Sequence, residues 1–448
     1  MIAPGWGILL VLGTLGALMS LVRALQQRRA WPAEWSRKSV HLIMGMICMT
    51  FPALFHENWP VWVLAGGAVV GLGALRVSPA LRHRFGSVLS GVQRESWGEL
   101  LFPLSVAFLF WLAHGQALFF RIPVLTLTLA DATAALIGQR YGIARYETDD
   151  GWKSVEGSTA FFIIAFLATH VLLLLGSSVG RLECLLIATV MGLILMLMEA
   201  IAWRGLDNLF VPLTSYACLV RLSGLGAADL TVRLGVLVAL TVALCFCRKA
   251  TRLTQSAAIG AALVLYVAWA VGDIHWLIAP LVTAVAYALV CAAAKERSPH
   301  TVHAIAVVGG LGLAWLCLAQ VLNTVNTIYA YGIGYASNLA IIALAYLAGR
   351  FPAPVFKLVI GAALLAYVPL AIPYLFVWRA NHHVAQLAAG ALLLVGLAAA
   401  AFATLEPSLR PCSTARARWV RQVAVAAVAS ALGFTLISLL EPWSTSFP

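Results

Sequence analysis

Apolar residues along this chain gather into long segments, and most charged residues fall in the short turns between them. A helix needs about 20 apolar residues to cross a bilayer, whereas the strands of a membrane β-barrel show alternating polar positions. The uninterrupted Ala, Leu and Val runs therefore predict membrane-spanning helices. About sixteen such segments can be delimited, at 6–24, 40–55, 61–76, 99–114, 117–137, 158–176, 182–202, 208–222, 230–247, 256–272, 276–294, 303–322, 333–349, 357–378, 384–404 and 420–440. The eighth is short and contains Pro212, which is compatible with a broken or re-entrant helix.

Composition agrees with this pattern. Hydrophobic residues make up 62% of the 448 positions and charged residues only 10%, whereas a soluble domain carries about 25% charged residues. We therefore predict an all-α, polytopic integral membrane protein with about 14–16 transmembrane helices.

Basic residues give the expected orientation. If the N-terminus is outside, all but five of the 29 Lys and Arg residues fall on one side, the exceptions being Arg121, Arg181, Arg221, Arg233 and Arg379. The positive-inside rule assigns the crowded side to the cytoplasm. We expect a protein of the bacterial inner membrane with both termini outside. The net charge of +12 then reflects topology, and no nucleic-acid partner is expected.

Charged residues inside or beside the spans cluster in the first half of the chain. We predict a catalytic membrane domain over 1–222 and a further helical membrane domain over 223–448. The second could serve as a scaffold, a lipid-binding unit or a regulatory unit.

The segment around Asp131 concentrates polar chemistry. On a helix, Asp131, Gly138 and Gly142 fall within one narrow arc, so the acid heads a strip with almost no side chain. Such a strip serves either as a packing seam or as a path for a phosphate chain close to the backbone. Asp is also a hard oxygen ligand for Mg²⁺.

The next turn supplies phosphate-binding chemistry. Lys153 and Glu156 are followed by Gly157 and Ser158, which open the next span. Ser158 or Thr159 is expected to cap this helix, whose N-terminus together with the lysine would form a phosphate cradle. The alternative is a Lys that reaches the interface and a solvated Glu.

Further polar residues enter spans from the same predicted face. Arg37, Lys38 and His41 share a helix face, where they would hold phosphate or simply orient the span. Additional carboxylates on this face are Glu95, Glu99, Glu199 and Asp207. Glu199 lies among apolar residues, so a metal or a basic partner is expected there.

These groups, gathered at one membrane face, suit a metal-bound polyphosphate. The chain has no P-loop, kinase glycine loop, Gly-x-Ser-x-Gly or His-Glu-x-x-His motif. The residues by themselves indicate a membrane enzyme that uses a cytoplasmic Mg–nucleotide on a lipid.

The motifs also resemble those of a known family. They are Arg37-Lys38-x-x-His41, Glu99 with Phe102-Pro103, Asp131-x-x-Ala134-x-x-x-Gly138-x-x-x-Gly142, Lys153-x-x-Glu156-Gly157-Ser158, Glu199 and Asp207-Asn208-x-x-x-Pro212. Their order and spacing, over roughly residues 35–220, resemble the dolichol kinase and phytol kinase family, which is related to the CDP-diacylglycerol synthases.

This resemblance implies a CTP-dependent kinase for the hydroxyl of an isoprenoid alcohol such as dolichol, another polyprenol, phytol or farnesol, with Mg²⁺ or Mn²⁺ as cofactor. It implies that metal is held by Asp131 with one of Glu156, Glu199 or Asp207, and that the proton acceptor is Glu99 or His41. It further implies that phosphate is bound by Arg37, Lys38, Lys153, Gly157 and Ser158, and that Gly138 and Gly142 admit the nucleotide.

Two alternatives stay open. A CDP-diacylglycerol synthase-like cytidylyltransferase shares the Asp–Gly–Gly strip, but Gly151-Trp152 precedes the lysine here, and no late Pro-Gly-His-Gly-Gly block follows. A transporter of lipids or isoprenoid phosphates would be expected to have charges near mid-span in both halves, whereas this chain keeps them in one half and at one face. Membrane lipids surround the chain in each case, and a homodimer is compatible with all three functions.

Overall fold

The computed structural model describes residues 3–29, 33–78, 96–148, 151–251, 253–294, 301–322, 324, 326–377, 382–406 and 416–440. Twelve helices in these ranges are long and apolar enough to cross a membrane, and two shorter apolar helices accompany them, Gly98–Ala113 and Ile274–Val290. Every predicted segment overlaps a helix. The protein is thus an all-α polytopic membrane protein, as predicted.

The chain divides into two compact units, Met1–Gly235 and Val236–Pro448. The first contains α1 (Pro4–Arg29), α2 (Ala33–Cys48), α3 (Phe51–Leu54), α4 (Trp59–Val77), α6 (Gly98–Ala113), α7 (Ala117–Leu125), the π-helix η1 (Thr126–Ala130), α8 (Asp131–Tyr141), β1 (Arg145–Thr148), β2 (Gly151–Ser154), α9 (Val155–Gly176), α10 (Arg181–Ile201) and α11 (Asp207–Leu222). The boundary falls within α12 (Ala227–Thr251).

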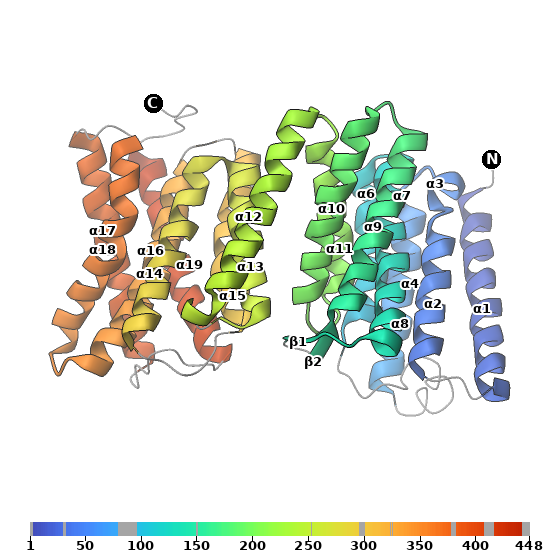
Figure 1. Ribbon diagram of the computed structural model, residues 1–448, viewed down its shortest axis with the longest axis horizontal. Coiled ribbons are helices and arrows are strands. Elements are labelled where there is room, and N and C mark those ends of the chain that lie inside the picture. Colours follow the sequence, from blue (N-terminus) through green and yellow to red (C-terminus); the bar gives the residue numbers. More distant parts are fainter. Residues whose placement is uncertain are drawn as a thin grey trace. The chain divides into compact units, whose positions relative to one another are not determined.

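In unit 1, α9 packs against both α8 and α10, and α6 packs against α4 and α11. Phe161 of α9 and Ile187, Met191 and Leu195 of α10 are fully buried. The antiparallel pair β1–β2 lies at the end of this helix bundle opposite the N-terminus of the chain (Figure 1). This short hairpin was not predicted from the sequence.

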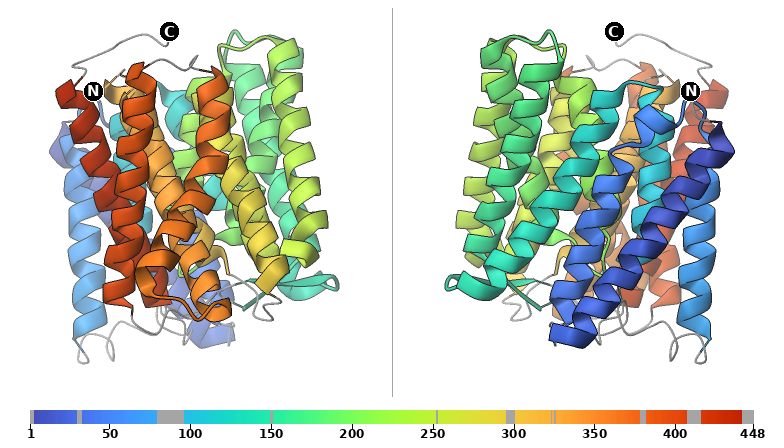
Figure 2. Two further views of the ribbon diagram at one scale, coloured as in Figure 1. Left: turned by 90° about the vertical axis from the view of Figure 1, so that its left-hand side faces the viewer. Right: turned by 90° about the vertical axis from the view of Figure 1, so that its right-hand side faces the viewer.

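The remaining helices form unit 2. They are α13 (Gln255–Gly272), α14 (Ile274–Ala294), α15 (Val302–Leu322), α16 (Asn326–Arg350), α17 (Val355–Val377), α18 (His382–Leu405) and α19 (Arg416–Leu440). Helix α16 contacts α14, α15, α17, α18 and α19 and is the most deeply buried helix of this unit (Figure 2).

The structure answers one expectation about an element directly. The eighth predicted span is not broken, because α11 runs without interruption through Pro212. Pro212 lies at the sixth position of α11, where the first turn has just ended, so its ring disturbs only the start of the hydrogen-bond ladder.

Candidate functional site

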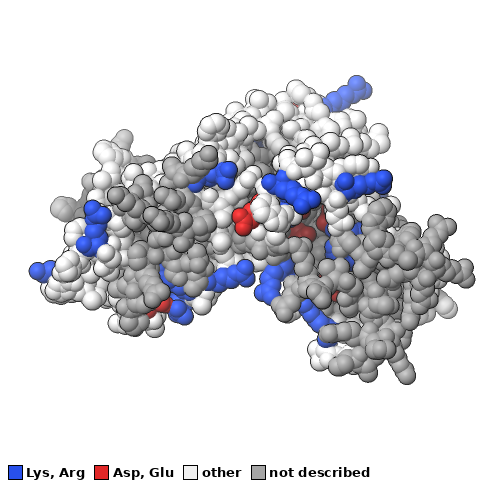
Figure 3. All heavy atoms as spheres, turned by 60° about the horizontal axis from the view of Figure 1, so that its bottom comes forward, with Lys and Arg blue, Asp and Glu red and all other residues white. Residues whose placement is uncertain are grey.

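A polar cavity of about 730 Å³ opens at the hairpin end of unit 1. Its lining contains five basic side chains, four acidic side chains and one histidine, namely Arg37, Lys38, Arg145, Lys153, Arg204, Glu99, Asp131, Glu199, Asp207 and His41. The space-filling view of this end shows Lys and Arg side chains around acidic ones (Figure 3). Residues from all six sequence motifs, which are far apart along the chain, therefore line one cavity.

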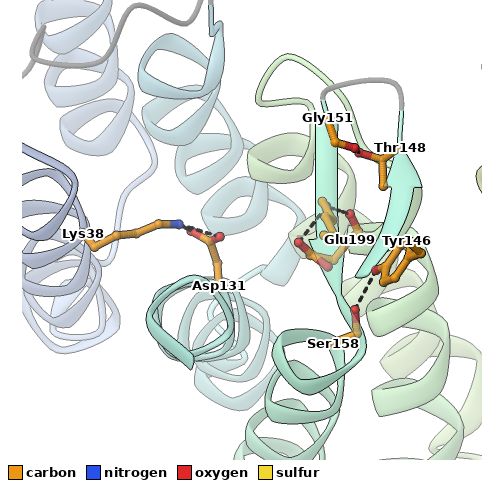
Figure 4. Close-up of polar contacts among 8 residues, drawn as sticks. Lys38, Asp131, Tyr146, Thr148, Gly151, Ser158 and Glu199 are labelled. Atoms are coloured by element: carbon orange, nitrogen blue, oxygen red, sulfur yellow. Dashed lines mark hydrogen bonds and ion pairs between the residues drawn. The ribbon is translucent and has the colours of Figure 1, made fainter. Parts of the chain in front are cut away.

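Asp131 and Lys38 form the first buried ion pair of this cavity. The Lys38 ammonium donates to both carboxylate oxygens of Asp131, each at 2.7 Å (Figure 4). His41 Nε2 lies 3.7 Å from Asp131 Oδ2, and the His41 ring packs edge-on against Phe102. One turn of α2 thus presents two functional groups to a single carboxylate, as the i,i+3 spacing predicts.

A π-helical segment places Asp131 at this position. The run Thr126–Ala130 is π-helical, and α8 begins at Asp131 directly after it. A π turn inserts one extra residue into the helical ladder and rotates everything that follows, and such turns are frequent at functional sites. This π segment could not be predicted from its residues, since Thr and Leu occur in ordinary helices too.

Lys153 and Glu199 form the second ion pair. The Lys153 ammonium donates to Glu199 Oε1 at 2.7 Å and also to the Glu199 backbone carbonyl at the C-terminal end of α10 (Figure 4). Burial alone would lower the pKa of Lys153, but attraction to the Glu199 carboxylate outweighs it and raises the pKa above its usual value. Lys153 therefore stays charged at neutral pH, and the basic partner predicted for Glu199 is present.

The β1–β2 hairpin holds Lys153 over the cavity. Tyr146 is the cross-strand partner of Lys153, and its hydroxyl lies 2.7 Å from Ser158 Oγ on α9 (Figure 4). Burial raises the pKa of the Tyr146 phenol, so it stays neutral and able to share a proton with Ser158. Tyr146 ties the hairpin to α9, a role that the sequence did not indicate.

The small residues of α8 and α9 pack closely together. A Cβ on Gly157 would lie 2.9 Å from the Ala134 carbonyl oxygen and 3.2 Å from Gly138 Cα. Gly142 packs against Ser154 and lies outside the cavity lining, whereas Gly138 and Gly157 line it. The strip is thus a packing seam, and its Gly138, together with Gly157 of α9, also forms part of the cavity wall.

Two expectations about α9 need revision. The cap is Ser154, whose side chain accepts from the Gly157 N–H at 3.1 Å, because the helix begins at Val155 as soon as β2 ends. Ser158 and Thr159 were therefore wrong choices. Glu156 lies outside the cavity lining and accepts from the Ala144 N–H at 3.0 Å. Its predicted role as a metal ligand stays a prediction that this placement does not favour.

The remaining predicted residues reach the cavity. Arg37 lines it from α2, Glu99 from the start of α6, and Asp207 from the start of α11. Glu95 lies outside the described residues. Sequence reasoning interpreted Arg145 and Arg204 only as orienting charges and assigned no role to Trp152, yet all three line the cavity. Their positions depend on the hairpin and on the α10–α11 turn, which carry no periodic signal.

The donor set of the cavity fits a divalent cation. Asp131, Glu199 and Asp207 supply carboxylates, and Asn208 adds a buried amide oxygen with no hydrogen-bond partner among the described residues. In the described part of the chain, no three His, Cys, Asp or Glu side chains stand close enough to enclose a metal by themselves. This pattern suits Mg²⁺, which is usually held by one or two carboxylates together with substrate phosphates.

The fold and the cavity define a polytopic helical membrane protein with a buried, charge-paired site at one end of its first unit. This chain is 32% identical over 207 residues to a phytol kinase of Synechocystis sp., a match that covers 45% of this chain and 84% of the relative. It is 30% identical over 188 residues to a probable chloroplastic phytol kinase of Zea mays, covering 40% of this chain and 61% of that relative. No family model and no solved structure matches the chain.

The chain belongs to the phytol/polyprenol kinase family. The family resemblance read from the motifs is thereby confirmed. Each match covers less than half of the chain.

Proposed function

We propose that this protein is a CTP-dependent kinase that transfers a phosphoryl group to the hydroxyl of an isoprenoid alcohol, with phytol as the first acceptor to test. The reaction would take place at the cytoplasmic face of the membrane. Membership in the phytol/polyprenol kinase family supports the reaction class. The basic side chains of the cavity would attract phosphates, which supports a phosphate-rich donor. They lie at the membrane face that the positive-inside rule is expected to assign to the cytoplasm.

Phosphoryl transfer requires mainly positioning and charge neutralisation. Lys153 is a fixed ammonium beside the cavity, because Tyr146 ties its hairpin to α9 and Glu199 of α10 accepts from its side chain. Arg37 and Lys38 supply cations from the opposite wall, on α2. Together they would neutralise the phosphates of the donor and bind them more tightly as charge develops during transfer.

Asp131, Asp207 and Glu199 are the residues that would hold Mg²⁺ or Mn²⁺, with Asn208 beside them. When bound, the metal would neutralise phosphate charge and fix the orientation of the donor. The short side chain of Asp207, at the first turn of α11, projects from a helix N-terminus, where an anionic ligand is also favoured.

The alcohol needs a proton acceptor within the same cavity. His41 Nε2 has no hydrogen-bond partner among the described residues and lies beside Asp131, which can orient the ring and stabilise it once protonated. Glu99 is the other predicted candidate but is exposed at the start of α6. We therefore propose His41 as the base.

The observation that carries this proposal is the convergence of two buried lysine–carboxylate pairs on one cavity in a member of this kinase family. The test incubates purified protein with Mg²⁺ and CTP that is labelled at either the α or the γ phosphate. Phytol, farnesol, a long polyprenol and phosphatidic acid are each offered as the acceptor. Label from the γ position recovered in an alcohol, with none from the α position, is the expected result.

Other label distributions would contradict the proposal. Label from the α position in lipid, with pyrophosphate released, would indicate a cytidylyltransferase. Transfer from ATP but not from CTP would refute the donor while keeping the kinase. No turnover of any nucleotide with any lipid would favour a transporter.

A further inference from the structure

Lys38 occupies the position on Asp131 that a divalent cation would take. Both oxygens of the carboxylate are engaged by one ammonium, each at 2.7 Å, and Lys38 is only 6% exposed. A carboxylate whose two oxygens are already paired offers no uncompensated charge to a second cation. A metal that binds Asp131 through these oxygens is repelled by the Lys38 ammonium until Lys38 moves away.

The two lysines of the cavity differ in how they are anchored. Lys153 donates to a backbone carbonyl as well as to the Glu199 carboxylate, so it keeps a partner if the carboxylate turns. Among the described residues, Lys38 has hydrogen bonds to Asp131 alone. Lys38 is therefore the lysine that would lose its partners if a metal ion arrived.

Displacing Lys38 has a cost that depends on what else enters the cavity. A buried ammonium without a counter-ion is strongly unfavourable, and a divalent cation next to it adds repulsion. A phosphate that enters with the metal would offer the released ammonium a new anionic partner in the same cavity. Metal and polyphosphate should thus bind jointly, and metal alone should bind weakly.

We propose that Lys38 is the resident cation of the Asp131 site and is exchanged for a divalent metal only when a polyphosphate enters with it. This exchange rests on the proposed function for its physiological ligand, a metal-bound nucleotide. It would keep the site neutral before the donor arrives and would prevent free divalent metal from occupying it.

The test measures Mn²⁺ binding by electron paramagnetic resonance on the purified full-length chain without nucleotide. Wild type should bind Mn²⁺ weakly at this site, and Lys38→Met should bind it at least about tenfold more tightly, because a competing cation has been removed. Asp131→Asn in the Lys38→Met background should abolish the gain. Arg140→Met removes a positive charge from the last turn of α8, outside the cavity lining, and should behave as wild type.

A second variant and a second measurement guard against misfolding. Lys38→Gln keeps an amide donor toward Asp131, and its Mn²⁺ affinity should fall between those of wild type and Lys38→Met. Thermal unfolding of wild type should be unaffected by Mn²⁺ or tripolyphosphate alone and shifted upward by both together. This measurement decides the matter if neither Lys38 variant folds.

The outcomes separate the exchange from the proposed reaction. Equal Mn²⁺ affinity in wild type and a folded Lys38→Met would overturn the exchange, and so would full thermal stabilisation of wild type by Mn²⁺ alone. If Mn²⁺ with tripolyphosphate stabilises wild type but CTP adds nothing and is not turned over, the exchange stands and CTP is refuted as the donor.

Discussion

The two units of this protein use buried polar groups in different ways. In unit 1, charged side chains form the pairs Lys38–Asp131 and Lys153–Glu199 around a cavity of about 730 Å³. In unit 2, a cavity of about 70 Å³ between α16, α17 and α18 is lined by aliphatic, glycine and tyrosine residues. One cavity has the size and charge for a nucleotide, and the other has neither.

Hydrogen bonds around α16 explain what the polar residues of unit 2 do. The Tyr331 hydroxyl donates to the Trp276 carbonyl at 2.6 Å, and the Tyr329 hydroxyl donates to the Leu387 carbonyl at 2.7 Å. Gln422 Nε2 donates to Asn338 Oδ1 at 3.1 Å. These neutral contacts join neighbouring helices, which is their usual task within membrane bundles. The buried Arg418 of unit 2 packs against the Phe402 and Trp419 rings and lines neither cavity. The comparison thus distinguishes a unit with lysine–carboxylate pairs around a large cavity from one whose helices are joined by neutral hydrogen bonds.

The largest expected effect follows from removing Lys153. Lys153→Ala should lower kcat/KM for phosphoryl transfer by about 10²–10³-fold, because a fixed cation at the transferring phosphate is lost. The exposed Lys357 of unit 2 provides the control, since Lys357→Ala removes the same group far along the chain and should leave activity unchanged. Initial rates over a range of CTP concentrations measure both. Comparable losses in the two variants would break the distinction between the units.

A smaller loss of activity is expected when the closely packed helices α8 and α9 are forced apart. Gly157→Ala places a Cβ 2.9 Å from the Ala134 carbonyl oxygen, so the helices must separate, at about 1–3 kcal/mol of stability. The cavity wall moves with them, and activity should fall by about tenfold or more. Gly67→Ala on α4 meets no atom within 4 Å and should stabilise slightly. Thermal melts and rate measurements compare the two variants. An unchanged melting temperature in Gly157→Ala would contradict the close packing of α8 against α9 at this position.

Arg204 offers a test of strain at the site. It lies on the cavity with a φ of 54°, a left-handed conformation that costs a non-glycine residue about 1 kcal/mol. Arg204→Gly should melt at the same or a higher temperature while activity falls by about tenfold through the lost cation. Arg204→Lys, which keeps the charge, should retain more activity. A lower melting temperature with full activity would show that Arg204 serves the fold instead.

The smallest effect on activity is expected in unit 2. Tyr331→Phe removes the hydroxyl that donates to the Trp276 carbonyl and should cost about 1 kcal/mol of stability. Activity per folded molecule should stay within about twofold of wild type, since α16 lies outside the charged cavity. Denaturation curves and specific activity check this prediction. A loss as large as that of Lys153→Ala would assign unit 2 a part in the reaction.

Periodicity and apolar runs were sufficient to predict the helices and the acid–glycine face of α8. The same runs, oriented by the basic residues, predicted that five functional residues lie at one membrane face, because each is at the end of a span. These residues are Lys38, His41, Asp131, Lys153 and Glu199. Which residues pair with which was not predictable. The Lys38–Asp131 pair joins positions 93 residues apart and depends on how α2 packs against α8.

Other features of the fold could not be predicted from the sequence, for local reasons. The hairpin from Arg145 to Ser154 is too short for strand periodicity, so the start of α9 and its Ser154 cap were misplaced. The hydrogen bond from the Ala144 N–H to Glu156, outside the cavity lining, also depends on this hairpin and could not be predicted. The π segment before Asp131 changes the helical phase at the very residue on which the site depends.

The most direct test of the account is to locate the bound nucleotide. A CTP analogue with a photoreactive group, cross-linked to the full-length chain in the presence of Mg²⁺ and digested, identifies the labelled peptides by mass spectrometry. The account predicts labelled peptides from the segments that line the cavity, in the ranges 37–41, 96–99, 131–158 and 199–208, with competition by CTP. Labelling confined to residues 236–448, with the same competition, would contradict it.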